Sequence, residues 1–229
     1  MGALTAMMRK DLRLELRSGR STIALIALSL LIMVVLVFAS GASAARRADS
    51  AAGALWVALV FSGMLGATRA LNAEHENGCI RGLLLSPLDP AAIFVAKLGA
   101  SFIFMTVAEA AAIVLAVLFF NLDFGMGIAR LVPVMMLGAL GFAALATLLA
   151  AISERTRAGD LMLPLLAVPM FVPALIAGVK ASSIALSGAP QAANALAMTQ
   201  WIRILAAFDV LFVAAGYLLF EHVVGEDQD

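Results

Sequence analysis

Charged side chains are scarce in this chain of 229 residues, where Asp, Glu, Lys and Arg together make up 13%. A soluble domain averages about a quarter charged residues, so a soluble globular fold is excluded as the main architecture. Basic and acidic residues number 15 each, which gives a formal net charge of zero. Without a basic excess to bind a phosphate backbone, the sequence argues against a nucleic-acid partner.

Residues that carry chemistry are also few. The single cysteine, Cys79, excludes an intramolecular disulfide. His75 and His222 are the only histidines, and they do not stand at a ligand spacing, so no metal site and no cofactor bound by this chain are predicted. The sequence has no GxxxxGK(S/T) phosphate loop. We therefore expect a protein that is not an enzyme, and any ATP hydrolysis would belong to a separate chain.

Apolar residues dominate instead, at 63% of the chain and a mean hydropathy of +1.04. They gather in six runs, each close to or above the ~20 residues needed to cross a ~30 Å hydrocarbon core. A cleavable signal sequence is disfavoured for the first run, because signals carry only about 7–15 apolar residues. We predict an all-α integral membrane protein, one domain over residues 1–229, with spans at about 22–40, 54–70, 91–119, 131–152, 161–181 and 200–220.

The distribution of Lys and Arg predicts the orientation. If the N-terminus is cytoplasmic, ten of the 15 basic residues fall on the inner side, as the positive-inside rule requires. Six spans then return the C-terminus to the cytoplasm.

Residues 4–20 precede the first span. Leu4, Met8, Leu12 and Leu16 recur every four residues beside a stripe of arginines. This pattern predicts an amphipathic elbow helix on the inner leaflet, although the segment could instead be a simple topology anchor.

Residues 69–90 form the longest cytoplasmic stretch between predicted spans. The stretch opens with polar residues that include Glu74 and Glu76, and it later presents Leu83 and Leu84. A short helix with such an apolar edge is suited to docking in a groove of a soluble partner. The alternative is an ordinary interfacial loop.

Small residues mark one face of the fourth run, where Ala139, Ala143, Thr147 and Ala151 recur every four residues. Such a ridge lets helices approach closely in lipid. The neighbouring helix could belong to this chain or to a second copy.

Prolines predict where helices start and bend. Pro90 suits the first turn of the third span, and Pro164, Pro169 and Pro173 predict that the fifth span is kinked or broken. Residues 182–199 are small and polar, so we predict an external loop there, with a short re-entrant helix as an alternative.

Two carboxylates fall inside spans: Glu109 is about mid-depth in the third run and Asp209 is about halfway along the sixth. An ionised acid at the bilayer centre costs at least ~2.5–3.5 kcal/mol, so such groups are usually buried, paired or protonated. Either a proton relay or an anchor that joins helices would explain them. We favour the anchor, as a neutral acid hydrogen-bonded to a backbone group or to a hydroxyl such as that of Thr106 or Ser101.

Several segments resemble one known family. They are KDLRLELRS at 10–18, GLLLSP at 82–87, AKL at 96–98, GFAALATLLAAISERTRAGDLMLPLL at 141–166 and AFDVLFVAAGYLLFE at 207–221. In this order, on a chain of this length, they resemble the CcmB family, the haem exporter permeases of cytochrome c maturation.

The resemblance implies an ABC-2-type permease of the cell inner membrane that works as a homodimer with a separate ABC ATPase. It also implies a haem-handling membrane protein, a periplasmic haem chaperone and a role in c-type cytochrome biogenesis. Glu74, Glu76 and Gly78 fit the family's acidic-then-glycine pattern in the segment that couples to the ATPase. Arg81 and Thr68 depart from that pattern, because the family usually has acids there.

Other functions remain open at this point. A generic ABC-2-type exporter of a drug or lipid would share this build. A proton-coupled secondary carrier would use Glu109 and Asp209, and a passive scaffold would only assemble partners. Methionines such as Met126 could ligate haem, but methionines in so apolar a chain mostly serve packing. We therefore expect haem to be held by a partner protein.

Overall fold

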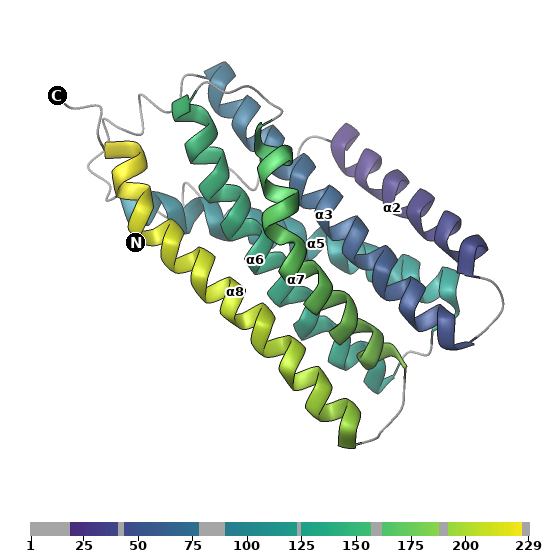
Figure 1. Ribbon diagram of the computed structural model, residues 1–229. Helices are drawn as coiled ribbons and strands as arrows, with labels where there is room; N and C mark the ends of the chain where they lie inside the picture. The colour runs from purple at the N-terminus through teal and green to yellow at the C-terminus, as the bar shows by residue number, and fades with distance from the viewer. Residues whose placement is uncertain are drawn as a thin grey trace.

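A computed structural model describes residues 19–40, 44–77, 90–122, 125–156, 162–187 and 192–225. Within these ranges the chain consists of six α-helices and has no strand, and Figure 1 shows them packed as one bundle. Each predicted run coincides with one helix, which confirms the all-α prediction. The helices are α2 (Gly19–Ser40), α3 (Ala44–Asn77), α5 (Pro90–Phe120), α6 (Met126–Thr156), α7 (Met162–Leu186) and α8 (Ala192–Gly225).

Five of these helices, α3, α5, α6, α7 and α8, are long and apolar enough to cross a membrane. In α2 the apolar segment among the residues with described side chains is Ala27–Ala39. The whole of α2 nevertheless has 22 residues, which at 1.5 Å per residue makes it about 33 Å long. The predicted elbow helix over residues 4–20 lies outside the described residues, except that Gly19 and Arg20 begin α2.

Two helices extend well beyond the predicted spans. Helix α3 begins at Ala44 rather than near residue 54, and α8 begins at Ala192 rather than near residue 200. The predicted external loop over 182–199 is therefore wrong for most of its length, because α7 also continues to Leu186. Hydropathy identifies only the part of a helix that crosses hydrocarbon. The added turns are rich in alanine, which has the highest helix propensity.

Proline acts as predicted at the start of α5, and inside α7 it does not interrupt the helix. Helix α5 begins at Pro90, as expected for a residue with no backbone N–H to pair. Helix α7, in contrast, runs unbroken from Met162 to Leu186 with Pro169 and Pro173 inside it, so the expected break does not occur. Neighbouring helices can cover the backbone groups that a proline frees, and for this reason membrane helices tolerate it.

Helix α5 ends just before an asparagine, a residue type that tolerates a left-handed backbone conformation. Asn121, just past the helix, has a φ of 49°. The next N–H, of Leu122, donates to the carbonyl oxygen of Val117 at 3.1 Å. This arrangement satisfies a helix-end carbonyl and turns the chain toward α6.

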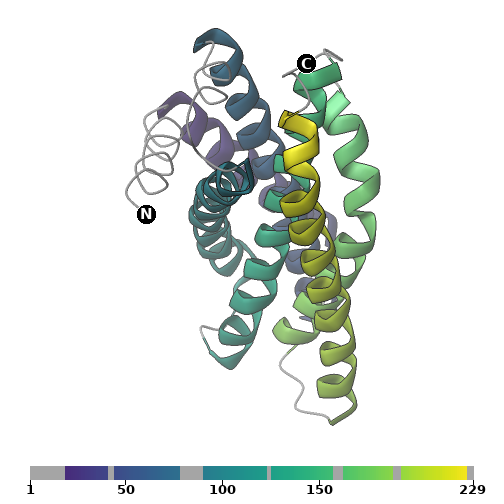
Figure 2. The ribbon, with the colours of Figure 1, turned by 90° about the vertical axis from the view of Figure 1, so that its left-hand side faces the viewer.

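Helix α6 is the centre of the bundle, in contact with α3, α5, α7 and α8. Its predicted small-residue ridge is buried within this single chain at Ala139, Ala143 and Thr147. The helix that approaches this ridge therefore belongs to the same chain rather than to a second copy. Helix α2 packs on α3 and α5, and α8 packs on α5, α6 and α7. Figures 1 and 2 show α2 and α8 on different sides of the bundle.

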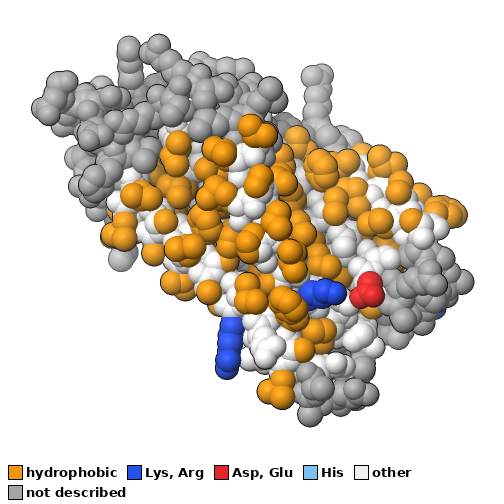
Figure 3. Space-filling view, in the orientation of Figure 1, with side chains coloured by type: hydrophobic (Ala, Val, Ile, Leu, Met, Phe, Trp, Pro, Cys, Tyr) orange, Lys and Arg blue, Asp and Glu red, His pale blue; other side chains and the backbone are white. Residues whose placement is uncertain are grey.

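The outer surface of the bundle is apolar. Large hydrophobic side chains point outward from α2, α7 and α8, and the most exposed is Phe38, at 84%. Figure 3 shows a face that is mostly hydrophobic, with its few charged groups near one end. A surface of this kind would aggregate in water and is satisfied by lipid tails, as expected for membrane-spanning helices.

Candidate functional site

Asp209 is buried at mid-length of α8, with 4% of its surface exposed. Both carboxyl oxygens are enclosed and have no hydrogen-bond partner among the described residues. Gly141 of α6 lies against this carboxyl group, since a Cβ added there would collide with Asp209 Oδ1. Within the described part of the chain, the hydrogen bond of the expected anchor is therefore not found at Asp209. The acid instead occupies a close-packed seam between α6 and α8.

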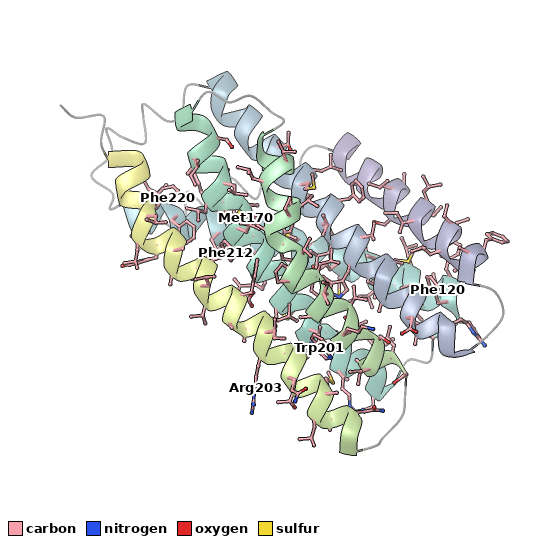
Figure 4. The ribbon with its side chains drawn as sticks, viewed as in Figure 1. Phe120, Met170, Trp201, Arg203, Phe212 and Phe220 are labelled. Atoms are coloured by element: carbon pink, nitrogen blue, oxygen red, sulfur yellow. The ribbon has the colours of Figure 1, made fainter. Side chains whose placement is uncertain are left out.

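Aromatic rings surround the α8 side of this seam. Phe208 packs edge-on against Phe171 of α7, with ring centroids 5.5 Å apart. Phe208 also packs against Phe212 at 4.4 Å. These rings supply apolar contact and no hydrogen-bond acceptor for a carboxylic acid. Figure 4 shows Phe212 and Phe220 on the same helix.

Glu109 is the second buried acid, at 3% exposed, on the buried stripe of α5 that includes Met105 and Ala112. Its Oε1 atom has no hydrogen-bond partner in the described part of the chain. The hydroxyl of Thr106, which was an expected partner, donates instead to the carbonyl oxygen of Phe102 at 2.8 Å. The hydrogen bond expected from Thr106 to Glu109 is therefore replaced by a bond within the turn of α5.

The two acids lie at a similar level of the bundle. Met105 of α5 and Phe142 of α6 both converge on Gly63 of α3. Glu109 is four residues beyond Met105, which is about one helical turn. Asp209 contacts Gly141, the residue next to Phe142. Glu109 therefore lies about one helical turn along α5 from the level at which Phe142 of α6 meets Gly63, and Asp209 meets α6 at the residue next to Phe142.

A junction built around a hydrogen-bonded tryptophan joins α3, α6 and α7, close to the level of the two acids along the bundle. The ring of Trp56 lies against Gly138 of α6 and Gly178 of α7, where any added Cβ would collide with it. Its indole N–H donates to Ser182 Oγ at 2.9 Å, and its ring stacks on Phe171 at 6.1 Å. Sequence analysis missed this junction. A tryptophan inside a span does signal a need for a hydrogen-bond partner, but it does not identify that partner.

Polar groups gather where α3 and α8 begin and α7 ends. Ser183 donates a hydrogen bond to Asp49 across the α3–α7 interface. Lys180 and Arg203 are exposed near this end. Figure 4 shows that Arg203 points away from the bundle, whereas Trp201 lies close to the bundle. Long basic side chains in membrane helices reach toward the headgroups, so a membrane boundary is expected near this end.

The predicted ATPase-coupling residues fall into two groups, one on the last turns of α3 and one after its end. Glu74 and Glu76 fall on its last turns, so the second membrane-spanning helix continues into this segment. Gly78, Arg81, Leu83 and Leu84 lie outside the described residues. Their docking role remains a prediction.

Metal or haem ligation finds no support in the part of the chain that is described. No group of three or more His, Cys, Asp or Glu side chains comes together there. Met126, which could in principle ligate, is 68% exposed. Chemically, the arrangement offers two isolated carboxyl groups that could exchange protons or bind water if neighbouring helices separated.

Long apolar helices around α6, with acids buried at mid-depth, define a multi-pass, all-α integral membrane protein. Comparison with known proteins gives the family: the model described as CcmB protein matches residues 2–224. The chain therefore belongs to the CcmB family, as the resemblance predicted.

Two relatives are both named Heme exporter protein B. The protein of Pseudomonas aeruginosa is 29% identical over 168 residues, which cover 72% of this chain and 73% of the relative. The protein of Rhodobacter capsulatus is 28% identical over 175 residues, which cover 76% of this chain and 80% of the relative.

Proposed function

We propose that this chain is the membrane permease subunit of an ATP-driven ABC-type complex in c-type cytochrome biogenesis, which exports haem or releases a haem chaperone. The family match over residues 2–224 carries the proposal. The names of two relatives and the multi-pass apolar bundle agree with it. The permease itself is not catalytic.

The energy source lies outside this chain. The sequence has no phosphate loop, so ATP binding requires a separate ABC ATPase. ABC ATPases close as dimers, and a six-span half-permease therefore works as a homodimer beside two ATPase copies. Contact with the ATPase is assigned to Glu74, Glu76, Gly78, Arg81, Leu83 and Leu84.

Haem is handled by the complex and is not a cofactor of this chain. Within the described residues no cluster of metal-ligating side chains is present. A haem-handling membrane protein and a periplasmic haem chaperone would hold haem instead. In this arrangement the chain converts ATPase closure into movement of membrane helices.

The proposed orientation has both termini in the cytoplasm of an inner-membrane protein. Ser187, an exposed residue just past α7, then lies outside, and native Cys79, between α3 and α5, lies inside. In a Ser187→Cys variant that lacks Cys79, a membrane-impermeant thiol reagent should label intact spheroplasts. The protein with only native Cys79 should be labelled after lysis alone. The reverse pattern would reject this topology.

A proton-coupled carrier is the second candidate, because Glu109 and Asp209 both carry buried oxygens without partners among the described residues. Such a carrier needs a titrating acid and needs no ATPase. In the ATP-driven complex, Glu109→Gln should keep most activity, since the amide has nearly the same size and removes only the titration. Complete loss of cytochrome maturation in this variant, with normal assembly, would favour the carrier.

The test of the proposal is purification of the tagged chain from its native membrane in a mild detergent. An ATPase subunit should co-purify and hydrolyse ATP. An ATPase variant that cannot hydrolyse ATP should remain bound and should stop cytochrome maturation. If maturation continues with that variant, the chain is a passive scaffold.

A further inference from the structure

The α6–α8 seam contains an unsatisfied polar group. Asp209 has both oxygens buried without a hydrogen-bond partner among the described residues, and its neighbours include Phe208 and the backbone at Gly141. Burial of a polar group without a hydrogen bond is unfavourable compared with its hydration. The packed seam is therefore less stable than the same seam with an apolar residue at position 209.

Hydration of Asp209 on the side that faces α6 requires the two helices to separate. A single added carbon at Gly141 would collide with Asp209 Oδ1 and lie 3.1 Å from a Phe208 ring atom. A water molecule needs at least as much room as that carbon, so none fits between the carboxyl group and α6 in this packing. Water reaches this side of the acid only when α8 moves away from α6.

Hydration of a polar group does not favour opening of the α3–α6–α7 junction in the same way. The N–H of Trp56 is paired with Ser182 at 2.9 Å, and the ring fills the space beside Gly138 and Gly178. Separation of these helices would break a buried hydrogen bond and leave a large cavity. These contacts favour a junction of α3, α6 and α7 that stays closed.

Helix α8 is also the least enclosed of the long apolar helices. In the most apolar stretch of α8, 22% is buried inside the bundle, compared with 67% in that of α3 and 61% in that of α6. Less packing within this chain holds α8 than holds the central helices, and its most extensive neighbour is α6. Figure 1 shows α8 along one side of the bundle.

We infer that the α6–α8 seam is the joint that opens when the ATPase closes, and that Asp209 is a positioning residue that favours the open, hydrated seam. This inference rests on the proposed function, because the ATPase supplies the movement. It assigns a specific pair of helices to that movement and gives a buried acid a purpose other than proton transfer.

Thiol labelling of the purified complex with its ATPase tests the inference. Leu205, fully buried on α8 one turn before Asp209, is changed to cysteine in a chain without Cys79. A water-soluble thiol reagent should react with this Leu205→Cys variant at least about tenfold faster when ATP holds the ATPase closed than in the absence of nucleotide, equivalent to ~1.4 kcal/mol. The matched control is Ala177→Cys, fully buried on α7, which should react equally slowly in both states.

Changes at Asp209 distinguish positioning from simple packing. Asp209→Leu should remove the nucleotide-dependent acceleration while the ATPase stays bound. Asp209→Asn should keep the acceleration, because a buried amide also gains from hydration. If Leu205→Cys prevents folding, Phe212→Cys, which is buried three residues beyond Asp209, provides the second probe.

Failure of this inference and failure of the proposed function give different results. Equal labelling in all nucleotide states, in a complex that retains its ATPase and hydrolyses ATP, overturns the inference alone. Acceleration that survives Asp209→Leu overturns the role of Asp209. If no ATPase is present in the purified complex, the proposed function fails and the inference fails with it.

Discussion

Changing both Leu83 and Leu84 to Asp should detach the ATPase from the permease. Complete burial of one leucine stabilises a contact by roughly 1.5–3 kcal/mol, so the pair supplies about 3–6 kcal/mol. The new carboxylates would also lose hydration on docking. Affinity should therefore fall by about two to four orders of magnitude. The measurement is the amount of ATPase that co-purifies with the tagged chain.

Two control variants accompany this double substitution. Leu83→Met with Leu84→Met keeps an apolar edge of similar volume and should retain the ATPase. Glu76→Ala should have little effect, because a solvent-screened ion pair is worth ~0–1 kcal/mol. If the double Asp variant inserts normally and still holds its ATPase, the segment that follows α3 does not couple the chain to the ATPase.

Replacing Trp56 by Ala should strongly destabilise the bundle. The ring is fully buried, it fills the space beside two glycines, and it donates a hydrogen bond to Ser182. Removal of a buried tryptophan typically costs about 3–5 kcal/mol, because the cavity closes only in part. The free energy of unfolding in mixed micelles, measured over a range of denaturing detergent, should fall by this amount.

An exposed aromatic residue provides the matched control. Phe38→Ala removes a ring that is 84% exposed on α2, so its effect should stay within about 0.5 kcal/mol. Trp56→Phe keeps most of the ring and loses the indole N–H, for a cost of about 1 kcal/mol. Equal losses for Trp56→Ala and Phe38→Ala would show that Trp56 is not at a tightly packed junction.

Apolar runs were sufficient to predict the six helices, because crossing hydrocarbon requires long, continuous apolar segments. The same signal could not show that α3 starts at Ala44 or that α8 starts at Ala192. Those turns lie in alanine-rich sequence with few large apolar residues, where helix propensity rather than hydropathy decides. The prolines of α7 predict a kink or a break, and the sequence alone could not decide between them, because cover from neighbouring helices allows the helix to continue through proline.

The buried acids could be located from the sequence, but their surroundings could not. That Asp209 is inside a span is visible in the sequence, whereas its contact with Gly141 of α6 depends on how two distant helices pack. Trp56 and Ser182, likewise, are 126 residues apart and meet only in the folded bundle. Contacts of this kind depend on shape complementarity, which periodicity and composition do not encode.

The central claim is that this chain is required, together with an ATPase, to make c-type cytochromes. Its most direct test is covalently bound haem, measured by haem stain and by spectra of membranes from cells that lack this chain. The account predicts loss of all c-type cytochromes, recovery with the wild-type chain, and no recovery with the double Leu83→Asp, Leu84→Asp variant. Intact c-type cytochromes in the deletion strain, accompanied by sensitivity to drugs, would contradict the account and favour a generic exporter.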